Sequence, residues 1–380
     1  MSRSLKVAQK SINKVMNGLK RRFPSQSALA IELGISRSTL NRFLHGQPVD
    51  RLNFIEISEN LNLDWQAIAD LEEASTTTKN SLNLEPASFI TGNPITEPRY
   101  FFGREKELKR LFNLLKKHPL QSAAIIGKRR TGKTSLLHYL KKIANRPANQ
   151  LRPSQKNDWL PHPENYSWVL VDFQDSRMTD REKLLTYILE SLKMTVPSPC
   201  NLDNFMEVVS DNLNSPTVIL MDEIGVGLER GAELDDRFWD SLRSLATNST
   251  NGNLAFVLAS LRPPMEIAKD TGRASSFFNI FAQTTTLGPL TEAEARELIA
   301  SSAIAFAEED VEWILTESGR WQCLLQILCR ECLFAMKNGE TDGWREEGLR
   351  QISPFAPLLL TREKEGEGTG EVKNQLSPNC

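Results

Sequence analysis

The segment QSAAIIGKRRTGKTSLLHYLKKI, residues 121–143, decides the fold of this chain. Its short apolar run predicts a buried strand, and the apolar spacing that follows predicts an amphipathic helix. The turn between them matches the pattern G-x-x-x-x-G-K-T, with residues Gly127, Lys128, Arg129, Arg130, Thr131, Gly132, Lys133 and Thr134. The bare pattern can arise by chance, so the flanking strand and helix matter more than the letters. In this setting it predicts a P-loop.

The residue types in this turn suit the binding of phosphates. The glycines let the backbone wrap tightly, so that successive N–H groups and the helix N-terminus face one anion. We expect Lys133 to reach the β- and γ-phosphates and the Thr134 hydroxyl to coordinate a metal ion. The predicted cofactors are therefore ATP or ADP with Mg²⁺.

A second apolar run, Thr217–Asp222, is followed by Glu223 and has the character of a Walker B strand. Asp222 is expected to hold the Mg²⁺, and Glu223 to polarise the attacking water. The alternative is a buried strand that happens to end in an acidic turn. The P-loop earlier in the chain favours the nucleotide site, and binding follows from it more directly than hydrolysis does.

Further apolar runs at 167–172 and 253–260, with helices expected at about 180–193 and 202–214, predict alternating strands and helices. This order is typical of a parallel sheet that binds its ligand at the carboxyl ends of the strands. Arg262 follows the last of these strands, so we expect it to sense the γ-phosphate. The alternative is a solvated arginine at a strand end.

Phe101–Leu108 reads FFGREKEL and resembles the G-R-E-x-E-L signature that precedes the P-loop in two families. These are the signal-transduction ATPases with numerous domains (STAND) and the archaeal initiator-type AAA+ ATPases. The resemblance implies that Gly103 and Arg104 lie at the adenine end of the nucleotide. On chemistry alone, a capped surface helix would explain the same residues.

The pattern turns helical from residue 287, with Thr291 as an expected N-cap. This part resembles the small helical lid of STAND and AAA+ proteins, although its stretch Gly319–Leu325 lacks the proline of their G-x-P-x-x-L-L motif. Cys329 and Cys332 lie in an expected helix, where small core residues explain them better than a metal site does. The expected division is a P-loop core at 99–286, a helical lid at 287–355 and a disordered tail at 356–380.

The N-terminal segment 1–73 predicts a small all-α domain, joined through a linker at 74–98 that is rich in Ser, Thr, Asn and Pro. QSALAIELGISRSTLNRFL, residues 26–44, resembles the helix-turn-helix of the phage-repressor (Cro-like) family. Gly34 would allow the turn and Ser36 would cap the second helix. The outward residues of that helix, expected to contact DNA, are Arg37, Ser38, Asn41 and Arg42.

The distribution of charge along the chain supports binding of a polyanion by the N-terminal segment. Residues 1–60 carry ten Lys or Arg against four Asp or Glu, a net +6, so the other residues must carry −8 to give the total of −2. The alternative is a trihelical bundle for protein contacts whose charges only solvate it. Five cysteines without regular spacing, and no apolar run of membrane-spanning length, predict a cytoplasmic protein.

Three functions fit these features. The first is a slowly hydrolysing, STAND-like ATP switch with a DNA-binding head, in which nucleotide state controls self-association and signals to an effector protein that the sequence does not identify. The second is an AAA+ initiator or loader ATPase acting directly on DNA. The third is a protein-interaction module with a structural nucleotide and no hydrolysis.

Overall fold

A computed structural model describes residues 4–8, 11–23, 25–26, 29–30, 33, 35, 37–61, 63, 65–68, 89–281, 283–339 and 343–360. The chain divides into two compact units, Met1–Asn83 and Leu84–Cys380. We call the first unit the head. Each unit is described by itself.

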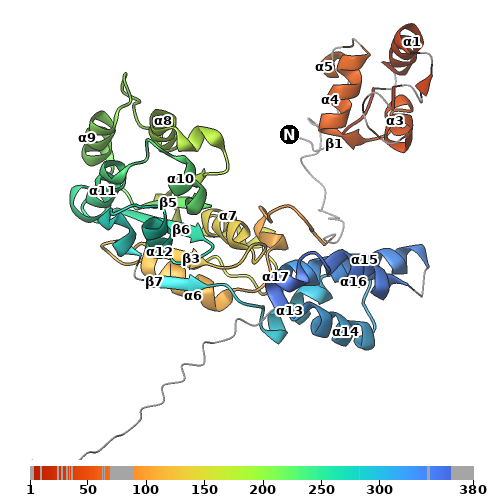
Figure 1. Cartoon of the computed structure of the whole chain (residues 1–380). Helices are drawn as coiled ribbons and strands as arrows, with labels where there is room; N and C mark the ends of the chain where they lie inside the picture. Colours follow the sequence, from red (N-terminus) through yellow and green to blue (C-terminus); the bar gives the residue numbers. More distant parts are fainter. Residues whose placement is uncertain are drawn as a thin grey trace, which may run out of the picture. The chain divides into compact units, whose positions relative to one another are not determined.

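The second unit is built on a five-stranded parallel sheet with the order β4-β5-β6-β3-β7. The strands are β3 (Ala123–Ile126), β4 (Ser167–Asp172), β5 (Thr217–Asp222), β6 (Leu254–Ser260) and β7 (Gln283–Thr286). β3, β4, β5 and β6 confirm the four strands predicted from the apolar runs. β3 lies between β6 and β7, so the turn that follows it opens near the middle of the sheet's carboxyl edge (Figure 1).

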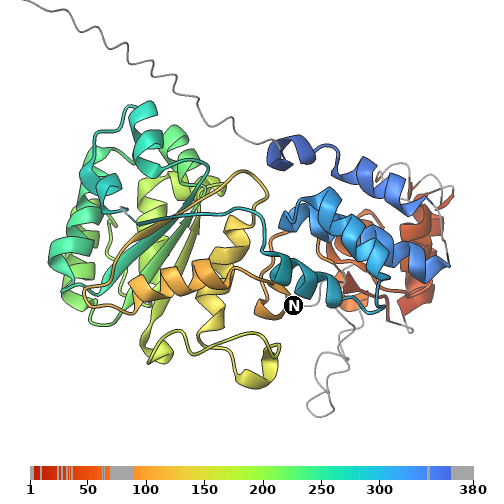
Figure 2. The same ribbon diagram turned by 90° about the horizontal axis from the view of Figure 1, so that it is seen from below.

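Helices cover both faces of the sheet, as Figure 2 shows. Alternate residues of β5 point to opposite faces: Ile219 and Met221 pack against α8 to α12, whereas Val218 and Leu220 pack against α6 and α7. The core helices are α6 (Glu105–Leu115), α7 (Lys133–Ile143), α8 (Arg181–Ser191), α9 (Leu202–Asn212), α10 (Ile224–Arg230), α11 (Asp236–Ser244) and α12 (Pro264–Asp270). Burial on both faces explains why these strands are continuously apolar rather than alternating.

Five further helices, which we call the lid, lie to one side of the sheet (Figures 1 and 2). They are α13 (Glu292–Ala300), α14 (Glu308–Ser318), α15 (Gln322–Asn338), α16 (Trp344–Ile352) and α17 (Ala356–Leu360). Thr291 and Glu294 form a capping box at the start of α13, as the sequence indicates. Cys329 and Cys332 are buried in the lid core. Residues 287–290, the hinge segment, join β7 to the lid.

The predicted tail begins too early. Residues 356–360 form α17, and Leu359 is buried among the apolar side chains of the lid. The apolar run PLLL at residues 357–360 allows this packing. Residues 361–380 lie outside the described part.

The predicted linker at 74–98 also differs from the structure in its last part. Residues 89–98, which we call the strap, are packed onto the second unit: Phe89 is buried in the lid core and Ile95 in the core beneath the sheet. Two buried apolar side chains explain why this part is held although it lacks a helical or strand period. The rest of the predicted linker, 74–88, lies outside the described residues.

The head contains α1 (Ile12–Arg22), α3 (Arg37–Leu44), α4 (Arg51–Asn60) and α5 (Trp65–Ile68), with a short antiparallel pair of β1 (Ser4–Leu5) and β2 (Val49–Asp50). Its core includes Val15, Leu40 and Phe43, and Phe43 meets Phe54 edge to face at 5.0 Å. Leu40 and Phe43 face inward as predicted. Gly34 and Ser36 lie outside the described residues, so their expected roles in a helix-turn-helix stay predictions.

In the part of the chain that the structure describes, no helix combines the length and apolar character needed to cross a bilayer.

Candidate nucleotide-binding site

The predicted P-loop forms the turn between β3 and α7. Gly127 follows the last residue of β3, and a methyl group on it would come within 2.6 Å of the Thr131 hydroxyl oxygen. Gly132 has φ +93°, a conformation that side chains other than glycine rarely adopt, and α7 begins at the next residue. Both predicted glycines are therefore required by the path of the turn.

Lys133 is buried inside this turn. Its Nζ donates to the carbonyl oxygens of Gly127 at 2.8 Å and Lys128 at 3.1 Å. Burial lowers the pKa of Lys133, while the nearby Glu223 and Asp222 carboxyls oppose that shift. The ammonium group is thus held at the centre of the loop, where it can reach an anion enclosed by the loop.

Thr134 and Asp222 meet across the site. The Thr134 hydroxyl donates to Asp222 Oδ2 at 2.6 Å, although the two residues come from α7 and the end of β5. Asp222 is 3% exposed, and burial raises the pKa of its carboxyl, as does the charge of Glu223, against the hydrogen bond from Thr134. A hydroxyl and a carboxylate in contact are oxygen ligands suited to Mg²⁺.

We expect Asp222→Asn to leave the melting temperature of the ligand-free protein unchanged or higher at neutral pH. Burial raises the folded pKa of Asp222, so the folded state binds its proton more tightly than the unfolded chain does. Stability therefore falls as the pH rises from the ordinary carboxyl pKa through the raised one, and an uncharged amide removes this cost. The Mg²⁺-dependent gain in ADP affinity should fall at least about tenfold, because one charged ligand is lost.

Titration calorimetry with and without Mg²⁺, beside thermal melts from pH 4 to 8, checks both parts of this prediction. In the wild type, Mg²⁺ should bind more weakly as the pH falls, because protons compete for the carboxylate. If the variant melts at a lower temperature and its ADP affinity still responds fully to Mg²⁺, Asp222 is not a ligand of the metal ion.

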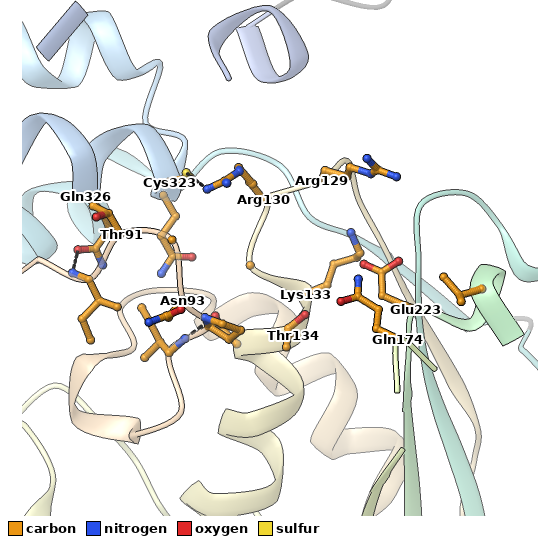
Figure 3. Close-up of a pocket in the computed structure, with 18 of the residues that line it drawn as sticks. Thr91, Asn93, Arg129, Arg130, Lys133, Thr134, Gln174, Glu223, Cys323 and Gln326 are labelled. Atoms are coloured by element: carbon orange, nitrogen blue, oxygen red, sulfur yellow. Dashed lines mark hydrogen bonds between the residues drawn. The ribbon is translucent and has the colours of Figure 1, made fainter. Parts of the chain in front are cut away.

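Glu223 follows Asp222 at the N-cap position of α10, in a left-handed conformation with φ 52°. This conformation is rare for a residue with a side chain and is often found where a functional site determines it. Figure 3 shows Glu223 beside Lys133 and Gln174 on one side of the cavity. The position suits a base that polarises a water molecule near the outer phosphate.

These groups open into one cavity of about 850 Å³. Gly132, Lys133 and Thr134 line it from the P-loop, with Arg129 and Arg130 beside them. The opposite wall comes from the strap, residues 90–95, and from the lid residues Gln322, Cys323 and Gln326 (Figure 3). Core, strap and lid therefore all contribute to the same cavity.

Several contributors to this cavity were not predicted from the sequence, among them Gln174 and the strap. Gln174 lines it from the loop after β4, next to the Walker B strand, and its backbone N–H donates to Asp172 at 2.9 Å. Its place at the carboxyl end of a predicted strand was a signal that could have found it. Strap residues 90–95 carried no such signal, because their contacts are with residues far along the chain.

The strap is fixed at both ends. Ile90 N–H donates to Gln326 Oε1 of α15 at 3.1 Å, and Arg330 of α15 donates to the Thr91 hydroxyl. Further along, Ile95 N–H donates to the Ser135 hydroxyl of α7 at 2.9 Å. Residues 90–95 therefore connect the lid to the P-loop helix along the wall of the cavity.

Gly103 and Arg104 do not line the cavity, contrary to the expectation that they bind the nucleotide. Arg104 is 2% exposed and donates to the carbonyl oxygens of Gly288 at 2.6 Å and Thr131 at 3.4 Å. Gly103, at φ +71°, packs so closely that a methyl group on it would lie 2.9 Å from Leu290. These residues join the P-loop to the hinge segment, and they position the site instead of touching its contents.

Arg262 is likewise absent from the cavity wall. Its side chain is about half exposed and pairs with Asp270 of α12 at 2.8 Å. Ser260 does reach the P-loop, because its carbonyl accepts from Gly127 N–H at 3.2 Å. In this arrangement Arg262 would have to leave Asp270 before it could meet a phosphate.

The predicted DNA-binding residues belong to the head. Asn41 and Arg42 are exposed on α3, in agreement with the outward positions expected for them. The side chains of Arg37 and Ser38 lie outside the described set. The backbone carbonyl oxygen of Asn41 contacts a ring nitrogen of His45, just after the end of α3, at 2.9 Å.

A parallel sheet of this order, with a P-loop-type turn after β3, Asp222 and Glu223 at the end of β5 and helices on both faces, is a P-loop fold of the AAA+ type. The ORC2 protein of Aeropyrum pernix in its ADP form matches with a TM-score of 0.50 at 12% identity, over 70% of this chain and 72% of that chain. The same protein in ADPNP–ADP complexes also gives 0.50, at 13% identity, over 70% and 71% of the two chains.

A Walker-type ATPase of Pyrococcus abyssi is similar as well, with a TM-score of 0.48 at 16% identity, over 70% of this chain and 77% of that one. No protein-family model matches this chain, and no curated protein does. At these identities the ORC2 likeness establishes the fold of the second unit.

Proposed function

We propose that this protein is an ATP-binding, slowly hydrolysing switch of the STAND type, in which the bound nucleotide sets the position of the lid relative to the core. The observation that carries the proposal is the shared cavity, which P-loop, strap and lid line together. A ligand that fills it contacts all three. Its binding free energy therefore depends on how they are arranged, which is the condition for a nucleotide to shift a conformational equilibrium.

Three details support a lid that responds to the ligand. The hinge segment is short, and Leu287 and Leu290 belong to different apolar cores. Arg130 of the P-loop reaches the lid directly, with its guanidinium 4.0 Å from the centre of the Phe355 ring. Thr134 lines the cavity and its hydroxyl contacts Asp222, so these two side chains are placed to bind a metal ion beside the nucleotide. The residues needed to hold MgATP or MgADP and to transmit its presence are therefore close together.

The nucleotide state should change the mass of the protein in solution. We expect purified protein to release ADP or ATP on denaturation, and light scattering to give a larger particle with ATP than with ADP. An unchanged mass in both states, with nucleotide bound, would leave an ATPase fold without a switch in self-association. Absence of any Mg²⁺-dependent nucleotide binding would remove the proposal.

We also propose that the head binds duplex DNA through α3. The support is the net charge of +6 over residues 1–60 and the exposure of Asn41 and Arg42. Arg42→Ala in the full chain should weaken DNA binding and reduce the slope of log affinity against log salt by about one. Fluorescence anisotropy at several salt concentrations measures this, with Arg177→Ala in the second unit as the charge-matched control. Equal slopes for wild type and Arg42→Ala would exclude Arg42 from the phosphate contacts, and the absence of any salt-sensitive affinity for duplex DNA would make the head a protein-contact module.

An AAA+ initiator or loader that acts directly on DNA is the second candidate, favoured by the fold shared with ORC2. The two functions differ in turnover. A loader should hydrolyse ATP faster when duplex DNA is added, whereas a switch should turn over slowly with or without DNA and retain ADP. Steady-state hydrolysis with and without DNA distinguishes them.

A further inference from the structure

Gln322 is the first residue of α15 and carries a buried amide without a hydrogen-bond partner. The residue is 6% exposed, and within the described part of the chain neither its Nε2 nor its Oε1 has a partner. Buried amides are nearly always paired, because an unmade hydrogen bond costs the full desolvation of the group. An unpaired one that faces a cavity therefore points to a partner from outside the chain.

The place of Gln322 identifies the part of a ligand that it faces. It lines the cavity, and a methyl group on Gly132 would lie 3.0 Å from its Oε1. In the P-loop pattern this turn presents backbone N–H groups to the α- and β-phosphates. The Gln322 amide thus faces, from the lid, the place where the P-loop would hold these phosphates.

The surroundings of Gln322 suit an anion. The first turn of α15 has no acidic residue, so its free N–H groups and positive dipole end are not offset there. Arg130 approaches the same turn, with Nη1 4.0 Å from the Cys323 sulfur. One turn further on, Gln326 also lines the cavity, but its Oε1 accepts from Ile90 N–H and the strap thereby holds this amide. Gln322 differs from it, because both polar atoms of its amide are buried without a partner.

We propose that Gln322 is the lid residue that binds the phosphate chain, with its Nε2–H donating to an oxygen of the α- or β-phosphate above Gly132. This rests on the proposed nucleotide site and names its lid contact. The amide can present either nitrogen or oxygen, since the hydrogen-bond partner decides its orientation. A phosphate oxygen at this point gives the Nε2–H group a partner, and its binding thereby favours the arrangement in which the lid lies close to the P-loop.

The test separates phosphate binding from packing. Gln322→Met keeps the length of the side chain and removes its hydrogen bond. The ligand-free variant should melt at the wild-type temperature or above, because an unpaired buried amide is lost. Its affinity for ADP and for inorganic tripolyphosphate, each competed against a fluorescent ADP analogue, should fall by about tenfold or more. Gln351→Met, in which the lost amide was paired with Glu347 on α16, should bind both probes as the wild type does.

Other outcomes overturn the inference. Unchanged affinity for both probes would show that Gln322 does not bind the ligand. A loss for ADP with tripolyphosphate unchanged would assign it to the base instead. Should Gln322→Met melt lower, Gln322→Asn keeps the amide one methylene shorter, and wild-type affinity there for both probes would contradict the phosphate contact. Failure of the wild-type protein to bind ADP is a different result, which would remove the nucleotide site itself.

Discussion

Lys133→Met is expected to weaken nucleotide binding more than about 100-fold, because two charge-assisted hydrogen bonds to phosphate oxygens are lost. The ammonium group also offsets the neighbouring Asp222 and Glu223 carboxyls, which raise its pKa against the effect of burial. Without it, nothing at the centre of the loop would offset the repulsion between these two carboxyls and a phosphate chain. Methionine retains the packing of the aliphatic stem, so the loss should be in binding.

The same substitution should not destabilise the ligand-free protein. Burial lowers the folded pKa of Lys133, so the unfolded chain binds its proton more tightly than the folded state does. The free energy of unfolding then rises with pH between the lowered pKa of the folded state and the ordinary lysine pKa. Below that pH window, the charged amine lowers the stability of the folded state. We expect an unchanged or higher melting temperature at neutral pH, and no further rise when MgADP is added.

Titration calorimetry and thermal melts with MgADP measure both effects. Lys141→Met is the matched control, because Lys141 lies on the same helix, is partly buried and does not line the cavity. It should bind ADP as the wild type does. Binding by Lys133→Met within threefold of the wild type would show that the turn does not hold phosphates, whatever its sequence.

Glu223→Gln is expected to slow hydrolysis by about 10² to 10⁴, the usual contribution of a general base, while ATP binding is retained. Glutamine preserves shape and hydrogen bonding but cannot accept the proton of the attacking water. The left-handed backbone at φ 52° should persist, since residue 223 holds the N-cap position of α10 in either case. The variant should therefore hold ATP for longer than the wild type and favour the ATP-bound assembly.

Single-turnover hydrolysis of labelled ATP checks this, with Glu229→Gln as the control. Glu229 is an exposed residue of α10 that does not line the cavity, so its loss should leave the rate unchanged. Equal rates for wild type and Glu223→Gln would favour the third function named above, a module whose nucleotide is structural.

The sequence predicted the parts of the site that depend on local pattern. β3, the P-loop and α7 are contiguous, and both the spacing of apolar residues and the positions of the glycines follow from the local backbone. The pairing of Thr134 with Asp222 was also predictable, because parallel strands bring their carboxyl ends to one edge of a sheet. These predictions needed no knowledge of distant contacts.

The predictions that differ from the structure concern side chains whose partners are distant or equally plausible. Arg262 was predicted to contact the γ-phosphate because it follows the end of a strand. In the structure it pairs instead with the carboxylate of Asp270, at the other end of α12. Arg104 precedes the P-loop in sequence and supports the hinge segment in space. Neither choice between partners is encoded in spacing, since it depends on how α12 and the hinge segment pack.

The strap differs from the predicted linker for a related reason. Its composition indicates a loop, and its residues do form one, but the loop is held by contacts as far apart in sequence as Ile90 and Gln326. Pattern reasoning recognises regular elements by their period, and an irregular segment pinned at a few points has none. The apolar residues Phe89 and Ile95, which are buried in the structure, were the only local signs that this segment packs onto the second unit.

The strap also decides where this protein can be cut for expression. A fragment begun at residue 99, the boundary that composition suggests, would retain the whole sheet and every lid helix. It would nevertheless lose the hydrogen bonds to Gln326 and Ser135 and leave the apolar sites of Phe89 and Ile95 open to water. Recombinant fragments of the second unit should therefore start before residue 89, and a protease that cleaves between the strap's two attachments should uncouple the lid without unfolding either part.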